Sequence, residues 1–385
     1  MKLLKRFLPF FLSLLLILPL LLCPVRADGD PAAPAAAEPF TLSSRHTVLM
    51  DADSKELLYR QNADEKAPIA STTKIMTAIV ALESEDAAKT LSVPAEAVGV
   101  EGSGIYLYEK EELTLEQLLY ALLLESANDA ATAIAVGLCG SVEAFAGKMN
   151  EKAAEIGLAS SHFVNPHGLP DENHYSTAHD LALLTAYALE NEEFARIVST
   201  YRTEIPLKGG EGSRLLINHN RLLRSVDGCI GVKTGYTQES GRCLVSAARR
   251  DGMTLIAVTL DASDDWNDHK KLYEYGFAQF TRQTVLTAGG FLCEVPAVGA
   301  ETPCRVTLQN RDAITLTLPK EHGTPVFTVY AAPFLYAPVR TDRPLGTLVI
   351  SYGGKEAARV PLWSMQEIAA KKRSSFFSFL RDLFR

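Results

Sequence analysis

Several features are scarce in this chain of 385 residues, and each scarcity excludes a class of protein. The 25 glycines and 19 prolines follow no collagen pattern, and no internal repeat is present. A mean hydropathy of +0.04 with 22% charged residues excludes a multi-span membrane protein, a coiled coil and a wholly disordered chain. The 47% of apolar residues instead predict a globular protein large enough for two domains.

Basic residues are outnumbered, 38 to 46, and many of them lie at the two ends of the chain. Residues 1–27 hold four basic residues and no acid, and residues 369–385 hold five basic residues and one acid. The net charge of −8 therefore hides a body, residues 28–368, of charge −16. An acidic body with a small basic tail argues against nucleic acid as the main partner.

The N-terminus has the layout of a secretory signal peptide over residues 1–27. Three basic residues precede an apolar run from Phe7 to Leu22, and small residues, Val25 and Ala27, mark a cleavage site. An uncleaved membrane anchor is the alternative, although the run is short for a bilayer span and contains two prolines. Residues 28–39 are a Pro/Ala-rich linker. We therefore expect an exported protein, on the extracellular or periplasmic side.

Five cysteines remain after this leader, so at least one is unpaired within the chain. Cys293 could face Cys304, and Cys229 could face Cys243, but a chain this long needs no disulfide for its core. Free buried thiols are favoured. The spacing of the cysteines matches no metal motif.

The C-terminus, residues 367–385, has the pattern of a basic amphipathic helix that lies in a membrane interface. Its apolar residues fall on one helical face, and a basic cluster precedes them. A helix docked on the protein's own core is the alternative. We expect peripheral attachment to the cytoplasmic membrane through Phe376, Phe377, Phe379, Leu380, Leu383 and Phe384.

Between the two ends, strand patterns flank a helical region. We expect a strand, turn and strand over residues 40–60, helices at 71–83, 115–124, 128–138, 142–156 and 177–189, strands at 231–236, 241–249 and 253–260, and a helix near 267–280. This order predicts an α+β domain over residues 40–283, with one antiparallel sheet built from its two ends. Residues 284–366, with short β-prone runs at 304–308, 313–318, 326–331 and 347–351, predict a small all-β domain.

Ser71 and Lys74 form an S-x-x-K motif at the start of the first expected helix. Residues three apart share a helix face, so the hydroxyl and the amine can meet. Lysine can activate a serine only if burial or a neighbouring cation lowers its pKa. The backbone N–H of a residue at a helix start can also stabilise an oxyanion. The motif alone is weak, because S-x-x-K occurs by chance about once in a chain of this length.

Two further motifs carry polar groups suited to the same chemistry. Ser126 and Asn128 lie between two expected helices, where they either aim into a cleft or cap the second helix. Lys233, Thr234 and Gly235 end a β-prone run and suit a substrate carboxylate. If this run is an edge strand, an extended peptide can pair with it, and the N–H of Tyr236 can serve as a second oxyanion donor. An ordinary solvated hairpin is the alternative.

In this order and spacing, the three motifs resemble those of the penicillin-recognising serine enzymes. The chain is more closely similar to the low-molecular-mass penicillin-binding proteins that act as D-alanyl-D-alanine carboxypeptidases. The similarity covers roughly residues 42–283 and rests also on the segments at 67–78, 122–131, 163–169, 175–178, 218–220 and 231–237.

The resemblance implies a β-lactamase/transpeptidase-like fold and a serine peptidase that trims peptidoglycan stem peptides ending in D-Ala-D-Ala, with β-lactams as covalent inhibitors. It implies that Ser71 is acylated, that Lys74 is its base and that Ser126 helps the proton relay. The implied substrate-binding residues are Asn128, Lys233, Thr234, Gly235 and Tyr236. No cofactor or metal is implied.

The chain departs from the family pattern at two places. Some relatives carry an arginine at the middle of Asn-x-Asn and another after K-T-G, whereas here His219 occupies the first place and residues 261–268 contain no arginine. Which residue makes the additional contact to the substrate carboxylate therefore stays open. His167 and His174 are not expected to act as bases, because no Gly-x-Ser-x-Gly elbow is present, and His167 is given a loop-structuring role.

Other functions on this scaffold remain as alternatives. A class A β-lactamase needs a loop glutamate in a Glu-x-x-Leu-Asn context, which is absent. A DD-endopeptidase or transpeptidase would use the same residues on another bond. A non-catalytic β-lactam sensor would need a signalling segment, and no spanning helix follows the domain.

Overall fold

The computed structural model describes residues 40–207 and 212–371. Three predictions fall outside the described residues: the signal peptide, the linker at 28–39, and the membrane contact of the apolar residues between Phe376 and Phe384.

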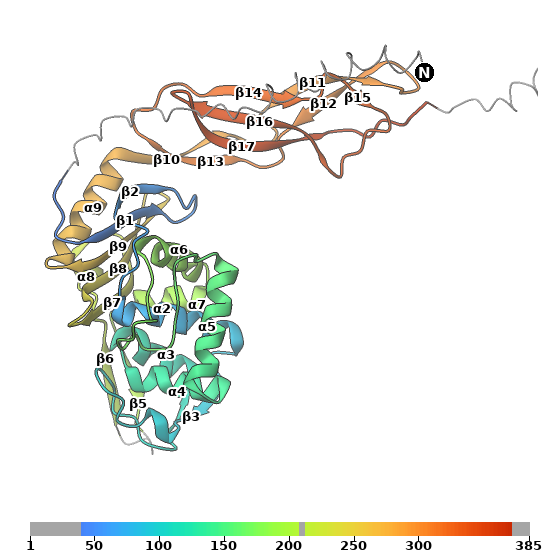
Figure 1. Ribbon diagram of the computed structural model, residues 1–385. Helices are drawn as coiled ribbons and strands as arrows, with labels where there is room; N and C mark the ends of the chain where they lie inside the picture. The colour runs from blue at the N-terminus through green and yellow to red at the C-terminus, as the bar shows by residue number, and fades with distance from the viewer. Residues whose placement is uncertain (1–39, 208–211, 372–385) are drawn as a thin grey trace, which may run out of the picture. The chain divides into compact units, whose positions relative to one another are not determined.

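A five-stranded antiparallel sheet forms the centre of the first part of the chain (Figure 1). The strand order is β2-β1-β9-β8-β7, so β1 and β2 from the start of this part join β7, β8 and β9 from its end through the pairing of β1 with β9, as predicted. The bounds are β1 His46–Asp51, β2 Leu57–Gln61, β7 Cys229–Thr237, β8 Gly241–Arg250 and β9 Met253–Ala262. The expected turn between β1 and β2 is present, and the Asp51 carboxylate accepts hydrogen bonds from the backbone and hydroxyl of Ser54.

Helices cover both faces of this sheet, which explains why its central strands are apolar throughout. Eight of the ten residues of β9 are buried in an unbroken run, and β1 is buried along its whole length. Helix α9, Asp265–Gln279, packs on β8 and β9 from one side. On the other side lie α6, Ala178–Leu189, and α7, Glu192–Ser199 (Figure 1).

Four of the remaining helices gather beside α6 and α7 and lie within three residues of their predicted limits: α2 Lys74–Ser84, α3 Leu115–Leu124, α4 Asn128–Cys139 and α5 Val142–Ile156. The short α8, Leu222–Ser225, was not predicted and packs against β7. The start of α3 is fixed by a capping box between Thr114 and Gln117, and α5 starts after Ser141, whose hydroxyl accepts from the Ala144 N–H. Short elements complete this part: η2 Ala70–Thr73, η3 Ala95–Ala97, β3 Thr90–Ser92, β4 Glu112–Thr114, β5 Arg202–Pro206 and β6 Ser213–Ile217.

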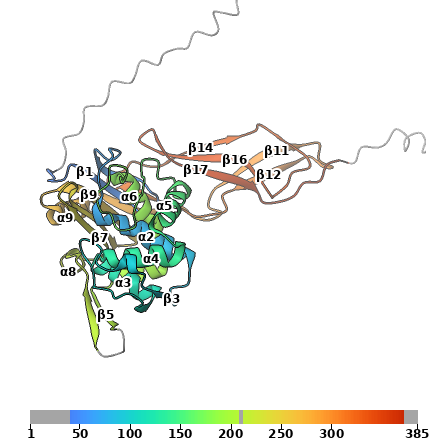
Figure 2. The same cartoon turned by 60° about the horizontal axis from the view of Figure 1, so that its bottom comes forward.

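The last strands form a sheet of their own, visible in Figures 1 and 2. Its order is β14-β16-β17-β12-β11-β15, with bounds β11 Leu292–Val298, β12 Cys304–Gln309, β14 Val326–Ala331, β15 Leu335–Tyr336, β16 Pro344–Tyr352 and β17 Lys355–Ser364. A separate ribbon pairs β10, Phe280–Leu286, with β13, Ile314–Pro319. Three of the four expected β-prone runs fall within these strands, the run at 313–318 begins one residue before β13, and the α+β prediction is confirmed.

Two expected boundaries need correction. The boundary at 283/284 falls inside β10, which continues directly from α9, so a division there would cut a paired strand. The helix expected from residue 367 does not begin there, because Ile368 and Ala370 form β-bridges with Val339 and Ala300. The rest of that predicted helix lies outside the described residues.

Within the described residues, no single helix is long and apolar enough to cross a membrane, and α4 with α5 pass that test only as a pair bent by 86°. No group of three or more potential metal ligands occurs in residues 40–207 and 212–371.

The five cysteines of the described residues are free, but only Cys243 is buried, so the expectation of buried thiols is correct for that residue and wrong for the others. Cys293 and Cys304 lie opposite other residues in the β11–β12 ladder.

Candidate active site

Ser71 lies in the 3-10 turn η2, directly before α2. The sequence predicted that Ser71 would open the α-helix, but the first α-helical residue is Lys74. The preceding Ala70 has a left-handed φ of 45°, and Thr72 closes the turn through hydrogen bonds from its N–H and hydroxyl to the Ile69 carbonyl. The tight turn brings Ser71 and Lys74 onto one side of the segment.

The Lys74 amine is fully buried and sits among three oxygen atoms from three separate segments. Its Nζ lies 2.9 Å from Ser71 Oγ, 2.7 Å from Asn128 Oδ1 and 2.6 Å from the His167 carbonyl oxygen. The expected meeting of Ser71 and Lys74 is therefore confirmed.

The electrostatic surroundings lower the pKa of Lys74 well below that of a free lysine. Burial is the main cause, and the positive charge of Lys233 adds to it, against a smaller opposing effect of Asp129. Burial also lowers the pKa of Lys233, to about 7, against the opposing charge of Glu125. Lys74 therefore has both features that can lower the pKa of a lysine enough to activate a serine, burial and a neighbouring cation.

Ser126 and Asn128 do not cap helix α4, so that alternative is wrong. The N-cap residue is Ala127, which lies between them and makes no side-chain cap bond. Ser126 has a left-handed φ of 61° in the turn between α3 and α4. The Asn128 amide is fixed at both ends, because its Nδ2 donates to the Glu101 carbonyl at 2.6 Å while Oδ1 faces Lys74.

A loop that carries one buried histidine, His174, and one half-buried histidine, His167, braces the turn around Ser71. The Val164 N–H donates to His174 Nδ1, so Nε2 carries the ring proton and donates to the Thr73 hydroxyl at 2.7 Å. Thr73 in turn donates to the Ala70 carbonyl at 2.8 Å. Gly168, with a φ of 86°, passes so close that a Cβ there would lie 1.9 Å from the same oxygen.

Burial keeps both histidines neutral, with the pKa of His167 lowered to about 3 and that of His174 to about 4. The side chain of His167 accepts from the Leu169 N–H, and its carbonyl holds Lys74. The predicted loop-structuring role of His167 agrees with these contacts. The part of His174 in bracing Thr73 was not anticipated.

The K-T-G segment lies on β7, which is an edge strand as the sequence argument required. The edge approaches the nucleophile so closely that a Cβ at Gly235 would lie 3.0 Å from the Ser71 backbone nitrogen. Lys233 is buried and its amine donates to the Thr234 carbonyl at 2.9 Å, whereas Tyr236 is 66% exposed.

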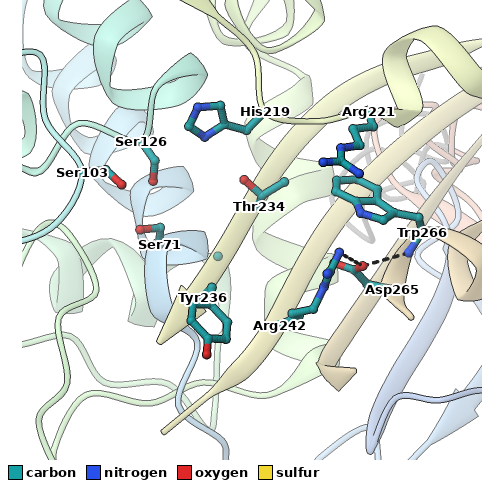
Figure 3. Close-up of a pocket in the computed structure, with 11 residues that line it drawn as sticks. Ser71, Ser103, Ser126, His219, Arg221, Thr234, Tyr236, Arg242, Asp265 and Trp266 are labelled. Carbon is teal, nitrogen blue, oxygen red and sulfur yellow. Dashed lines mark hydrogen bonds and ion pairs between the residues drawn. The ribbon is translucent and has the colours of Figure 1, made fainter. Parts of the chain in front are cut away.

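One cavity of about 540 Å³ joins these motifs (Figure 3). Ser71, Ser126 and Ser103 lie on one side of it, Thr234, Gly235 and Tyr236 line its centre, and His219 lies above them in the view. The far side contains residues that the sequence argument did not select: Arg221, Arg242, Asp265 and Trp266. Neither arginine lies at a position that relatives use, so the motifs give no signal for them.

The sequence model of the D-alanyl-D-alanine carboxypeptidase family matches residues 32–264, which include every motif of the cavity. The chain belongs to this family. Among its relatives, D-alanyl-D-alanine carboxypeptidase DacF of Bacillus subtilis (strain 168) is 30% identical over 365 residues, covering 92% of each chain. DacC of Escherichia coli (strain K12) is 31% identical over 370 residues, covering 91% of this carboxypeptidase-family chain and 90% of its own.

Solved structures of family members share the fold. Penicillin binding protein 5 from Haemophilus influenzae superimposes with a TM-score of 0.77 at 27% identity, covering 87% of this chain and 100% of its own. The carboxypeptidase DacD from Francisella tularensis gives a TM-score of 0.69 at 26% identity, covering 89% and 98%. The match extends beyond the residues of the family model, so it includes strands of the C-terminal sheet.

Proposed function

We propose that this protein is a serine D-Ala-D-Ala carboxypeptidase that removes the terminal D-alanine from peptidoglycan stem peptides through an acyl-enzyme on Ser71. The observation that carries the proposal is the environment of the Lys74 amine. Asn128 Oδ1 and the His167 carbonyl can only accept hydrogen bonds, because the Asn128 amide nitrogen is engaged elsewhere. A neutral amine that donates to both has its lone pair left for the Ser71 hydroxyl.

This arrangement supports general-base activation of the nucleophile. Lys74 takes the proton as Ser71 Oγ attacks the carbonyl carbon of the D-Ala-D-Ala peptide bond. The oxyanion that forms accepts from the N–H groups of Ser71 and Tyr236, on the two sides of the gap that Gly235 leaves. Collapse of this intermediate breaks the C–N bond, and Ser126 relays a proton to the departing amine. Water then hydrolyses the ester and releases the shortened peptide.

Substrate binding is assigned to the open edge of β7. An extended peptide can add to this edge through backbone hydrogen bonds, while the Thr234 hydroxyl meets its carboxylate and the buried Lys233 amine acts on it only through its charge. Asn128 was predicted to bind substrate, but both ends of its amide are engaged and it does not line the cavity, so we assign it to holding the Lys74 amine. A β-lactam, with an amide carbonyl and a carboxylate of its own, is proposed to acylate Ser71 in the same cavity.

The decisive experiment is incubation of the purified protein with diacetyl-L-lysyl-D-alanyl-D-alanine and assay of free D-alanine. Stoichiometric release of D-alanine and dipeptide supports the proposal, and no release contradicts it. Adding glycine as an acceptor separates hydrolysis from transpeptidation, because a transpeptidase would form a new peptide bond. Rapid turnover of benzylpenicillin would indicate a β-lactamase instead.

We further propose a separate role for each part of the chain. Residues 1–27 would direct export, residues 28–39 would form a linker, and the part that ends with α9 at Gln279 would carry out catalysis. The strands from β10 to β17 would form a spacer, and residues 372–385 would attach to the outer face of the cytoplasmic membrane. The boundary is placed at the end of α9 because β10 already pairs with β13.

Membrane attachment by the tail can be measured with vesicles of phosphatidylcholine and phosphatidylglycerol. We expect the chain without its signal peptide to sediment with them, and a chain ended at Lys371 to bind about tenfold more weakly or less, because the apolar face and basic cluster are gone. Release of D-alanine from the tripeptide should be equal for both. Equal vesicle binding would overturn the assignment of the tail.

A bell-shaped dependence of kcat/KM on pH is expected for the free enzyme. Activity rises with pH as Lys74 loses its proton, at a pH below that of an ordinary lysine because its pKa is lowered. It falls as Lys233 loses its proton, because burial lowers the pKa of Lys233 to about 7 in the free enzyme. In the complex, the substrate carboxylate stabilises charged Lys233, so the falling limb of kcat should lie at higher pH than that of kcat/KM.

Lys233→Arg identifies the group behind the falling limb, because a guanidinium stays protonated throughout the range. The limb should disappear in this variant while the rising limb is retained. A falling limb that is unchanged in Lys233→Arg would show that another group is responsible.

A further inference from the structure

The wall of the cavity opposite Ser71 contains two arginines that are not part of the three motifs. Arg221 comes from the loop before α8, and Arg242 comes from β8, where it pairs with Tyr236 across the ladder. Both guanidinium groups lie over the ring of Trp266, at 6.0 and 5.9 Å from its centre. Figure 3 shows this group of side chains on the side of Thr234 away from Ser71.

Arg242 is held in place by an ion pair. Its Nη2 donates to Asp265 Oδ1 at 2.6 Å, and the same oxygen accepts from the backbone N–H of Trp266 at 3.0 Å. The Asp265 side chain is 5% exposed, whereas that of Arg242 is 43% exposed. The pair therefore places a buried negative charge beneath a cation that faces the cavity, and together they contribute little net charge.

Arg221 is held by a loop with several hydrogen bonds, and its positive charge is not balanced by an ion pair within the described residues. Asn218 donates to the carbonyls of Val198 and Thr200, and Asn220 accepts from the Leu222 N–H, which fixes the chain on both sides of His219. No ion pair involves the Arg221 guanidinium within the described part of the chain. In Figure 3 the Arg221 side chain extends over Trp266 toward the Thr234 side of the cavity.

The neighbouring cation of the K-T-G segment cannot reach far into the cavity. Lys233 is buried, and its amine is bound to the Thr234 carbonyl. A carboxylate that enters beside the Thr234 hydroxyl therefore meets the two arginines as its exposed cationic partners, while His219 is turned to the Glu125 carboxylate at 3.1 Å.

We propose that Arg221 binds the terminal carboxylate of the substrate, with Arg242, Asp265 and Trp266 as the platform that positions it. The inference rests on the proposed function and adds the residues that select a peptide with a free C-terminus. It places the cationic contact at positions other than the two that relatives use. Arginine suits this task because its planar guanidinium can bind a carboxylate through two parallel hydrogen bonds.

The test compares Arg221→Gln with the parent on two substrates, diacetyl-L-lysyl-D-alanyl-D-alanine and its C-terminal amide. The variant should lose about 10- to 100-fold in kcat/KM on the free acid, the usual range for one charge-assisted contact. On the amide, which has no carboxylate, parent and variant should agree within about twofold. Arg224→Gln is the matched control, because Arg224 lies three residues after Arg221, on α8, and stacks on Tyr201. It should leave both rates unchanged.

A second pair of variants tests the platform. Arg242→Gln leaves the Asp265 carboxylate without its cation beside the incoming carboxylate, so activity on the free acid should fall more than activity on the amide. Adding Asp265→Asn removes that charge and should restore at least part of the lost activity on the free acid. No recovery in the double variant would overturn the role assigned to Arg242 and Asp265.

The outcomes separate the inference from the proposed function. If the parent releases no D-alanine from the free acid, the proposed function fails. If the parent is active but Arg221→Gln loses activity equally on acid and amide, or on neither, the function stands and Arg221 does not bind the carboxylate.

Discussion

Ser71→Ala is expected to abolish both reactions of the enzyme, lowering kcat for release of D-alanine by about 10⁶-fold and leaving no covalent adduct with a fluorescent penicillin. The methyl group removes the only atom to which the acyl group is transferred. The fold should survive, because Lys74 keeps its contacts to Asn128 and His167. Intact-protein mass spectrometry after exposure to benzylpenicillin measures the adduct directly.

Ser84→Ala provides the matched control, since Ser84 ends α2, the helix that follows Ser71, and its hydroxyl only donates to the Val80 carbonyl. This variant should be acylated like the parent. If penicillin still attaches to Ser71→Ala, another residue is the nucleophile and the proposed mechanism is wrong.

Replacement of Lys74 should have the second largest effect. Lys74→Met removes the base and should slow acylation by penicillin by about 10² to 10⁴-fold, the usual contribution of general-base catalysis. Its melting temperature should change little, because the loss of hydrogen bonds to Asn128 and His167 is offset by removal of a buried amine. Stopped-flow acylation and thermal unfolding measure the two quantities.

Lys74→Arg distinguishes a proton acceptor from a mere positive charge. A guanidinium keeps its proton at all accessible pH values, so this variant should be as slow as Lys74→Met. Rapid acylation of Lys74→Arg would mean that the charge of Lys74, and not its lone pair, assists Ser71.

Much of the fold could be predicted because local chemistry determines it. The limits of α3 and α5 match their predicted ranges, since Thr114 and Ser141 cap them with side-chain hydrogen bonds. By contrast, α7 was missed, although Glu192–Ser199 is strongly amphipathic, because eight residues are too few for periodicity to stand out. The hairpin of β5 and β6 was missed as well, since only one residue of each strand is buried.

The site was predictable in its residues but not in its geometry. The three motifs give the identities of the groups, and the S-x-x-K spacing gives the meeting of Ser71 and Lys74. No pattern reveals that Ser126 takes a left-handed conformation or that His174 braces Thr73, because these depend on contacts between segments far apart in the chain. The arginine wall was missed for the same reason, since Arg221 and Arg242 meet only over Trp266.

The three contacts of the Lys74 amine make activity depend on the native packing of three segments. Its partners come from the turn at Ser71, the start of α4 at Asn128 and the loop at His167, so the site exists only while all three segments are docked together. Partial opening of any one of them would silence the enzyme without unfolding the rest. A damaged or incompletely folded copy would therefore be inert, and would not become an indiscriminate hydrolase at the cell wall.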